Sequence, residues 1–187
     1  ECLKYHGTPE KPDIKIFVSH RIDQDSETID NPLYIPVRCG AVYDERENVT
    51  MLGDDTGDNI SEKRNSFCEL TVLYWAWKNV KADYYGLCHY RRYISFAKKS
   101  FRPKNDKSGF LVTDKLSRSN LKKFSLQNTE AMKEEILQHD LITTPSENVY
   151  YAWDGKHSSM YELCKSRIRD FDMNGVDSFI KIIKEKY

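Results

Sequence analysis

The chain of 187 residues and 22.0 kDa is long enough for one domain with a core, and its 39% hydrophobic and 12% aromatic content excludes wholesale disorder. Its 29 basic and 29 acidic residues balance, so the overall charge does not indicate a nucleic acid partner. The five cysteines lack C-x-x-C spacing, which argues against a zinc site or a disulfide framework, and no apolar run approaches the ~20 residues that cross a bilayer.

The first residues of the chain lead into a predicted strand. Residues 1–13 are polar and contain two prolines, and we interpret them as a leader or as the tail of a preceding segment. Residues 14–18 predict the first strand, and His20 follows its carboxyl end. Ligands of open α/β sheets bind beyond the carboxyl ends of strands. His20 is therefore a candidate nucleotide contact, although local hydrogen bonds in a loop would explain a histidine here equally well.

An acidic glycine loop follows at residues 53–61, with the sequence GDDTGDNIS. A calcium loop of the EF-hand type does not fit, because the carboxylates do not alternate and no terminal glutamate follows at the required place. One interpretation is that Asp54, Asp55 and Asp58 anchor the ribose or base of a donor, while Gly57 and Asn59 shape the turn. The other is a solvated turn, rich in Asp and Asn, that precedes a helix.

Residues 66–79 predict an amphipathic helix. Ser66 and Glu69 have the S-x-x-E spacing of a capping box at its start. Apolar residues then recur at i, i+3, i+4 and i+7, which predicts one buried stripe. The stripe consists of Leu70, Leu73, Tyr74 and Trp77.

A second strand is predicted at residues 83–88, and the sequence HYRRY follows it directly. The guanidiniums of Arg91 and Arg92, the imidazole of His89 and the phenol of Tyr93 suit a diphosphate, which arginine binds through two parallel hydrogen bonds. The alternative is that the two arginines point to opposite faces and form ordinary ion pairs.

The second half of the chain continues the alternation of helices and strands. Residues 95–124 predict a loop with a small hairpin or added strand, residues 129–139 a helix, residues 141–144 a third strand, and residues 175–187 an amphipathic helix. Aromatic residues between 146 and 154 are candidates for an acceptor platform. A β-α-β rhythm favours a mostly parallel sheet. We therefore expect the three predicted strands in one sheet, with the helix of residues 66–79 packed on it and the acidic loop at the same mouth as HYRRY.

Four sequences in this order, KIFVSH, DDTGDNIS, CELTVLYWAWKN and YGLCHYRRY, carry a family resemblance. The chain resembles the domain of capsular and exopolysaccharide biosynthesis proteins that was long catalogued as of unknown function. That family is associated with glycosyltransferases, including galactofuranosyltransferases. The resemblance implies a GT-A-like, Rossmann-type α/β domain with a mostly parallel central sheet flanked by helices. Residues 14–187 would form one nucleotide-sugar-binding domain, truncated at its C-terminus relative to family members.

The resemblance also implies roles for the candidate residues. The catalytic candidates are His89, Arg91 and Arg92, and the donor-binding candidates are His20, Asp54, Asp55, Asp58, Asn59 and Tyr93. Enzymes of the GT-A type usually carry a D-x-D metal motif after a middle strand, where this chain has HYRRY. We therefore expect donor binding without manganese or another metal cofactor. The acceptor base is not assigned: Glu147, Asp154 and His157 are candidates by position.

The implied partners are a nucleotide-sugar donor and a glycan or lipid-linked glycan acceptor, with no nucleic acid. The implied location is the cytoplasm, at the inner face of the membrane, with peripheral rather than transmembrane association. An alternative function is a non-catalytic nucleotide-sugar-binding or assembly module of a polysaccharide-synthesis complex. Turnover of a nucleotide sugar distinguishes the enzyme from the binding module.

Overall fold

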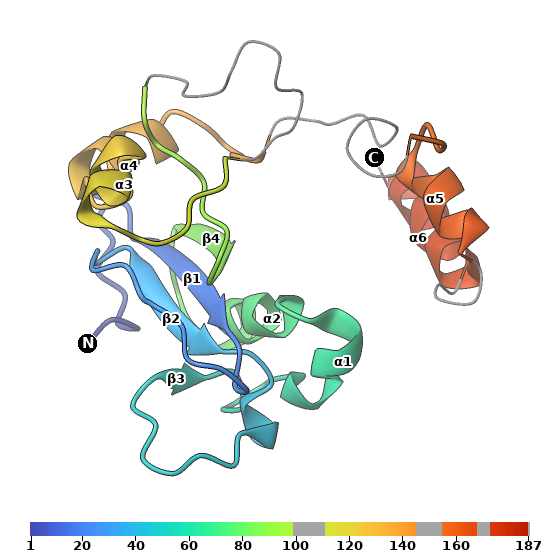
Figure 1. The fold of residues 1–187 in the computed structure, drawn as a ribbon, viewed down its shortest axis with the longest axis horizontal. Helices are drawn as coiled ribbons and strands as arrows, with labels where there is room; N and C mark the ends of the chain where they lie inside the picture. The colour runs from blue at the N-terminus through green and yellow to red at the C-terminus, as the bar shows by residue number, and fades with distance from the viewer. Residues whose placement is uncertain (99–110, 145–154, 168–172, 187) are drawn as a thin grey trace. The chain divides into compact units, whose positions relative to one another are not determined.

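The computed structural model describes residues 1–98, 111–144, 155–167 and 173–186 (Figure 1). The chain divides into two compact units, residues 1–100 with 113–143 and residues 101–112 with 144–187, where the sequence predicted one domain over residues 14–187. All the predicted catalytic and donor-binding residues belong to the first unit.

Within the described residues, the sheet consists of four parallel strands in the order β3-β2-β1-β4. The strands are β1 (Ile14–His20), β2 (Tyr34–Arg38), β3 (Leu52–Gly53) and β4 (Tyr84–His89). The predicted strands at residues 14–18 and 83–88 are confirmed as neighbours, and so is the α/β class with a parallel sheet. All seven residues of β1 are buried, as expected for a central parallel strand covered on both faces.

The strand predicted at residues 141–144 is wrong. These residues have no regular secondary structure, and Leu141 is 80% exposed. Only Leu141 and Ile142 are apolar in this stretch, so it has little surface to bury against a sheet. The β-α-β unit that it was expected to complete does not form there.

Short helices connect and cover the strands of the first unit. They are η1 (Ala41–Tyr43), η2 (Ser61–Lys63), α1 (Arg64–Phe67), α2 (Leu70–Asn79), α3 (Arg118–Lys123) and α4 (Thr129–Ile136). The second unit contains α5 (Met160–Ser166) and α6 (Met173–Lys186). The helices predicted at residues 129–139 and 175–187 are confirmed as α4 and α6.

The helix predicted at residues 66–79 is interrupted. Cys68 has a φ of 47° and a ψ of −130°, a non-helical backbone conformation that ends α1 before α2 starts at Leu70. The predicted capping box is also wrong, because Ser66 lies inside α1 and no side chain caps the start of α2.

The sheet and α2 share the main core. Val72 and Trp75 of α2 pack with Phe17 of β1 and Val37 of β2. The rings of Phe17 and Trp75 meet edge to face, with centroids 6.1 Å apart, which is a favourable geometry for two aromatic rings. This packing orients α2 and therefore decides which of its sides faces solvent.

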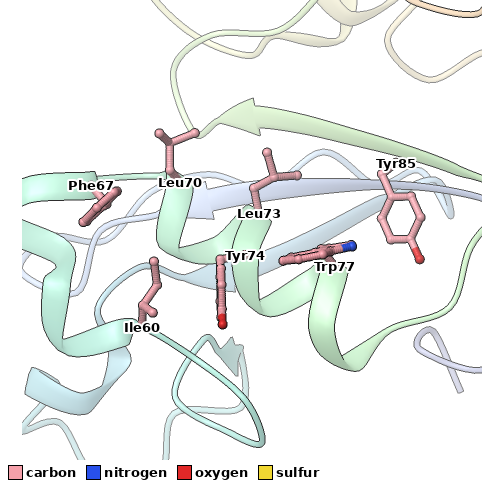
Figure 2. Close-up of a pocket in the computed structure, with 7 residues that line it drawn as sticks. All are labelled: Ile60, Phe67, Leu70, Leu73, Tyr74, Trp77 and Tyr85. Atoms are coloured by element: carbon pink, nitrogen blue, oxygen red, sulfur yellow. The ribbon is translucent and has the colours of Figure 1, made fainter. Parts of the chain in front are cut away.

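The apolar stripe that the sequence predicted to be buried lines an open groove (Figure 2). Trp77 is 63% exposed and Leu70 is 50% exposed. α2 is apolar on two sides, and Thr71 on the inward side hydrogen-bonds to the buried carboxylate of Asp54. That bond favours burial of the Thr71 side. The groove is lined by Ile60, Phe67, Leu70, Leu73, Tyr74, Trp77 and Tyr85.

A smaller core forms around α3 and α4, which Figure 1 shows at the end of the sheet where β1 and β2 begin. The side-chain amide of Asn31, just before β2, donates to the carbonyl of Leu126 at 3.1 Å and connects this core to the sheet. Residues 111–112 are not in a strand and residues 118–123 form α3, so the described part of residues 95–124 does not contain the expected hairpin. Residues 99–110 lie outside the described part. The buried residues of this core are Leu121, Phe124, Leu126, Met132 and Ile136.

Residues 1–13 pack against the amino ends of β1 and β4. The hydroxyl of Tyr5 and the backbone N–H of Asp13 donate to the carboxylate of Asp83, at 3.0 and 2.7 Å. The buried ammonium of Lys15 donates to Asp13 at 2.5 Å and to the carbonyl of Lys4 at 2.9 Å. The segment interpreted as a leader is thus bound to the first unit.

Replacing Trp75 with Ala is expected to lower the free energy of unfolding by about 3–5 kcal/mol, because it removes a buried ring from the core. Trp77→Ala is the matched control. Its ring is largely exposed, so we expect a loss below about 1 kcal/mol. Urea unfolding followed by circular dichroism measures both variants. Equal losses at the two positions would contradict the orientation of α2.

Candidate functional site

The candidate site lies where β1 and β4 end side by side. In the sheet, β2 and then β3 lie on one side of β1, whereas β4 lies on its other side. The direction in which successive strands are added therefore reverses between β1 and β4. Ligands of open α/β sheets bind at the carboxyl ends of strands at such a reversal. Ser19 pairs with His89, and the N–H of Tyr90 donates to the carbonyl of Ser19 at 3.0 Å. His20 and His89 therefore share this edge, which we call the switch-point edge.

A tight turn after β4 presents both arginines of HYRRY to solvent. The N–H of Arg92 donates to the carbonyl of His89 at 2.8 Å, and the N–H of His89 donates back to the carbonyl of Arg92 at 3.3 Å. The guanidinium of Arg91 lies 5.0 Å from the ring centre of Tyr90. Within the described residues neither arginine forms an ion pair, so the ordinary ion pairs of the alternative interpretation are not found there.

His89 has a defined hydrogen-bonding role in this turn. The N–H of Arg91 donates to its Nδ1 at 3.3 Å, so Nδ1 acts as an acceptor and a neutral ring carries its proton on Nε2. Burial lowers the pKa of His89, and the cations of Arg92, Arg91 and Arg21 lower it further against the opposing effect of Glu69. The neutral ring thus offers an N–H donor at the switch-point edge.

His20 is more deeply buried than its neighbour and is only 1% exposed. Its Nδ1 lies 2.6 Å from the hydroxyl of Ser26, and its Nε2 is buried without a hydrogen-bond partner in the described part of the chain. Burial, with a smaller contribution from His89, lowers the pKa of His20 to about 4. His20 is therefore neutral at pH 7, and any direct ligand contact through Nε2 requires the side chains around it to move.

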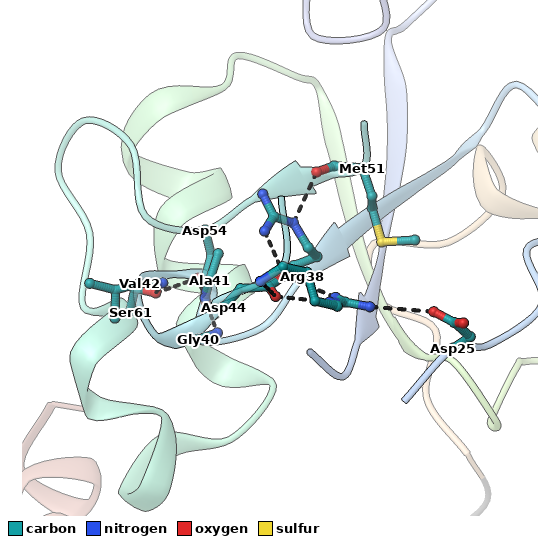
Figure 3. Close-up of polar contacts among 10 residues, drawn as sticks. Asp25, Arg38, Gly40, Ala41, Val42, Asp44, Met51, Asp54 and Ser61 are labelled. Atoms are coloured by element: carbon teal, nitrogen blue, oxygen red, sulfur yellow. Dashed lines mark hydrogen bonds and ion pairs between the residues drawn. The ribbon is translucent and has the colours of Figure 1, made fainter. Parts of the chain in front are cut away.

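Asp54, predicted to bind the donor, instead anchors the loops behind the edge. Its carboxylate is fully buried and accepts hydrogen bonds from the backbone N–H groups of Gly40 and Ala41, at 3.0 and 2.9 Å. It also accepts from the hydroxyls of Ser61 and Thr71, at 2.6 and 2.5 Å. Figure 3 shows the contacts with Gly40, Ala41 and Ser61. The carboxylate is used by the fold and has no surface open to a donor.

The structure does not bring Asp58 and Asn59 to the switch-point edge. The side chain of Asn79, in the last turn of α2, accepts from the N–H of Asp58 at 3.0 Å, and the hydroxyl of Tyr74 donates to the Asp58 carboxylate at 3.0 Å. The last turn of α2 leads to the amino end of β4, whereas His89 lies at its carboxyl end. Asn59 accepts from the N–H of Ser61, as in a turn rich in Asp and Asn.

The two remaining predicted donor contacts have different surroundings. Asp55 is exposed, and its carboxylate lies next to Gly53 at the end of β3, two strands away from β1. Tyr93 is half-buried and packs edge to face on Tyr34, with ring centroids 5.5 Å apart. Burial raises the pKa of the Tyr93 phenol, which therefore stays protonated at neutral pH.

Sequence reasoning missed further charged residues near this edge. Arg21, which directly follows His20, forms a bidentate ion pair with Asp23. Arg64 of α1 lies 3.8 Å from the same carboxylate. Arg21 follows the carboxyl end of β1, so the rule that selected His20 also selects Arg21. Arg64 and Glu69 carry no comparable signal, since only the tertiary fold brings α1 and the start of α2 to the strand ends.

A second charged network lies beside Asp54 and holds the loop between β2 and β3 (Figure 3). Arg38 and Arg46 both donate to Asp44, at 2.6 and 2.8 Å, and Arg46 also lies 3.3 Å from Asp25. The Arg46 guanidinium, with help from Arg38, holds the pKa of Asp44 well below its usual range. These arginines are committed to the fold, in contrast to Arg91 and Arg92.

Two further observations concern the described residues as a whole. No group of three or more His, Cys, Asp or Glu side chains in the described ranges is arranged to hold a metal ion. In the same ranges, no helix is both long and apolar enough to cross a membrane.

The chain matches one protein family and is similar to a solved structure. Residues 15–187 match the family described as Domain of unknown function (DUF4422). The chain belongs to this family. No curated protein matches the chain. Among solved structures, it is similar to the apo structure of the bifunctional glycosyltransferase WbbM, with 29% sequence identity and a TM-score of 0.69.

That likeness extends over 80% of this chain and 25% of the WbbM chain, so the DUF4422 chain spans about a quarter of the length of its relative. The resemblance to a domain long catalogued as of unknown function is thus confirmed, together with a likeness to a glycosyltransferase. The capsular role and the galactofuranosyl type are not part of what these comparisons show.

Asp54→Ala in this DUF4422 chain is expected to lower the free energy of unfolding by about 3 kcal/mol or more, because four buried donors lose their acceptor. The neighbouring Asp55→Ala should change it by no more than about 0.5 kcal/mol, since Asp55 is exposed. Chemical denaturation of the two variants measures the contrast. If Asp55→Ala destabilises as much, Asp54 is not the anchor.

The buried His20 should also make stability depend on pH. Its pKa is about 4 in the folded chain, against 6.5 for a histidine of the unfolded chain, so between these values the unfolded chain binds a proton that the folded chain does not. The contribution is complete above about pH 6.5 and falls as the pH decreases toward 4, by about 2 kcal/mol or more.

Unfolding free energies of wild type, His20→Asn and the exposed control His6→Asn, measured from pH 4 to pH 7.5, check this dependence. The slope should flatten in His20→Asn and stay unchanged in His6→Asn. A wild-type slope retained in His20→Asn would show that other groups cause it.

Proposed function

We propose that this chain is the donor-binding part of a glycosyltransferase and that it transfers a hexose from a nucleotide sugar to an acceptor hydroxyl. The observation that carries the proposal is the likeness to the glycosyltransferase WbbM, at 29% identity over 80% of this chain. The basic turn at the switch-point edge supports it, because this is the place where open α/β sheets bind nucleotides.

The chemistry of transfer explains why cations are needed at this edge. The bond between the anomeric carbon and the donor diphosphate breaks, the acceptor oxygen forms a new bond to that carbon, and the electron pair remains on the leaving diphosphate. Hydrogen-bond donors stabilise such developing charge most effectively when they are already oriented toward it before the reaction. Arg91 and Arg92 are exposed and lack carboxylate partners in the described residues, so their guanidiniums are available for this role.

His89 adds a neutral donor beside the two guanidiniums. Its Nδ1 accepts from the N–H of Arg91, which leaves the Nε2–H to donate to a phosphate oxygen. We assign donor binding to these three residues. His20 acts behind them as a packing residue. We retain Asp55 and Tyr93 as donor contacts of lower rank, because Asp55 lies two strands away from β1 and the half-buried ring of Tyr93 packs on Tyr34. Asp54 supports the loops.

The finer assignments form part of the same proposal. We propose that the donor binds without manganese, since positive charge at this edge comes from guanidiniums. The acceptor is a glycan or lipid-linked glycan of a capsular polysaccharide or exopolysaccharide, and galactofuranose is one candidate for the transferred sugar. The reaction takes place in the cytoplasm, at the inner face of the membrane. These assignments rest on the family resemblance.

The central experiment is calorimetric titration with uridine, guanosine, adenosine and thymidine diphosphates, followed by an assay for sugar transfer from the nucleotide sugar that corresponds to the best binder. Each titration is repeated with EDTA and with manganese. Binding with transfer supports the enzyme. Binding without transfer to any acceptor glycan would favour the non-catalytic module, and binding only with manganese would contradict the metal-independent site.

Arg91→Ala or Arg92→Ala should weaken nucleoside diphosphate binding by about ten- to a hundredfold, because a hydrogen bond to a charged group contributes roughly 1.5–3 kcal/mol. Lysine at the same position should recover only part of the loss, since it keeps the charge but not the planar fork. The same calorimetric titration measures both changes.

Arg118→Ala is a matched control for these substitutions, because Arg118 is exposed at the start of α3, away from the switch-point edge. It should bind the diphosphate like wild type. Unchanged affinity in both Arg91→Ala and Arg92→Ala would show that the donor is held elsewhere.

A further inference from the structure

A carboxylate close to the switch-point edge is shared by two guanidiniums. The Nε of Arg21 donates to Asp23 Oδ1 at 2.7 Å, and the Nη2 of Arg21 meets the second carboxylate oxygen. The Nη2 of Arg64 lies 3.8 Å from Oδ1 of the same residue. Asp23 thus faces one arginine that follows β1 and another that belongs to α1.

Arg21 lies beside the basic turn that follows β4. Its charge helps to lower the pKa of His89, and it also interacts with Tyr90. Arg91 and Arg92 act on His89 in the same direction. Arg21 is therefore electrostatically part of the same cationic group.

Arg64 is held at the carboxyl end of β2 by its packing. Gly40, two residues after β2, has a φ of +69°, and a Cβ added there would lie 2.2 Å from Cδ of Arg64. The Arg64 side chain therefore lies directly against the glycine backbone, and only 25% of it is exposed. Together the cations form a row along the ends of three neighbouring strands, β2, β1 and β4.

The carboxylate of Asp23 contacts these cations as a bound anion would, rather than as a structural anchor. The Arg21 guanidinium holds the pKa of Asp23 at about 2, so the carboxylate is charged at neutral pH. Its two oxygens face Arg21 as two oxygens of a phosphate would. Both partners of the Arg21–Asp23 pair are nearly half exposed, at 46% and 47% of their side chains. Such exposed pairs contribute little free energy, so a stronger anion can replace the carboxylate.

We propose that Asp23 is an internal counter-anion that occupies Arg21 and Arg64 in the free protein, and that a diphosphate displaces it and binds the same two guanidiniums. The inference deepens the proposed function, on which its choice of ligand rests, and assigns two further donor-binding residues. No bond is made or broken in the exchange, because one set of hydrogen bonds and ion pairs replaces another.

The direction in which Asp23→Asn changes the affinity for pyrophosphate tests the proposal. Asp23→Asn keeps the shape of the side chain but removes the competing charge, so pyrophosphate should bind about two- to fivefold more tightly than to wild type. A residue that only supports the loop, or that contacts the ligand favourably, would weaken binding when replaced. Calorimetric titration of the full chain with pyrophosphate measures the affinity.

Two controls separate displacement from a general change in charge. Asp25→Asn removes a carboxylate two residues away that pairs with Arg46, and it should leave the affinity for pyrophosphate unchanged. Arg21→Ala should weaken binding by about tenfold or more. In the Arg21→Ala background Asp23→Asn should tighten binding less than in wild type, because only Arg64 remains to be released and residues that act on each other are not additive.

The proposal is overturned if Asp23→Asn binds pyrophosphate no more tightly than wild type, if Asp25→Asn tightens it equally, or if neither wild type nor Asp23→Asn binds it. These outcomes are distinct from failure of the proposed function. Tightening in Asp23→Asn without any sugar transfer would support the anion exchange and refute the transferase. Sugar transfer with no effect of Asp23→Asn would refute the exchange alone.

Discussion

The buried carboxylate of Asp54 is the constraint on which the rest of the first unit depends. It accepts hydrogen bonds from the backbone after β2, from Ser61 of η2 and from Thr71 of α2, so one side chain joins three segments that are distant in sequence. A carboxylate is acceptor-only when ionised, and burial is tolerable because all these contacts come from donors. By binding Thr71, it helps to turn the Val72 and Trp75 side of α2 toward the sheet.

That orientation has consequences at both sides of α2. The inward side closes the core over β1 and β2, while the outward side leaves Leu70 and Trp77 in an open groove beside β4. The start of α2 brings Glu69 near His89, and α1 before it brings Arg64 to Gly40. The residues at the switch-point edge are therefore positioned by the same contacts that hold the helix on the sheet.

The charged residues of the first unit divide into two groups with different physical roles. Asp54 and the network of Arg38, Asp44 and Arg46 are satisfied within the protein and stabilise loops. Arg91 and Arg92 extend into solvent beyond the strand ends and have no carboxylate partner in the described residues. Charge that the fold does not use, at the reversal point of a parallel sheet, is the physical basis for assigning anion binding to this edge.

The sequence alone determined the class of the fold, the neighbouring strands β1 and β4, and the placement of His20, His89, Arg91 and Arg92 at strand ends, because β-rich runs and the residues that follow them are local features. It did not determine the role of Asp54, which side of α2 is buried, or that residues 141–144 have no regular secondary structure. Asp54 and Asp58 look alike in one acidic loop, yet one is buried among four donors and the other lies at the far end of α2. Only the tertiary structure separates them, because burial and hydrogen-bond partners depend on segments that are distant in sequence.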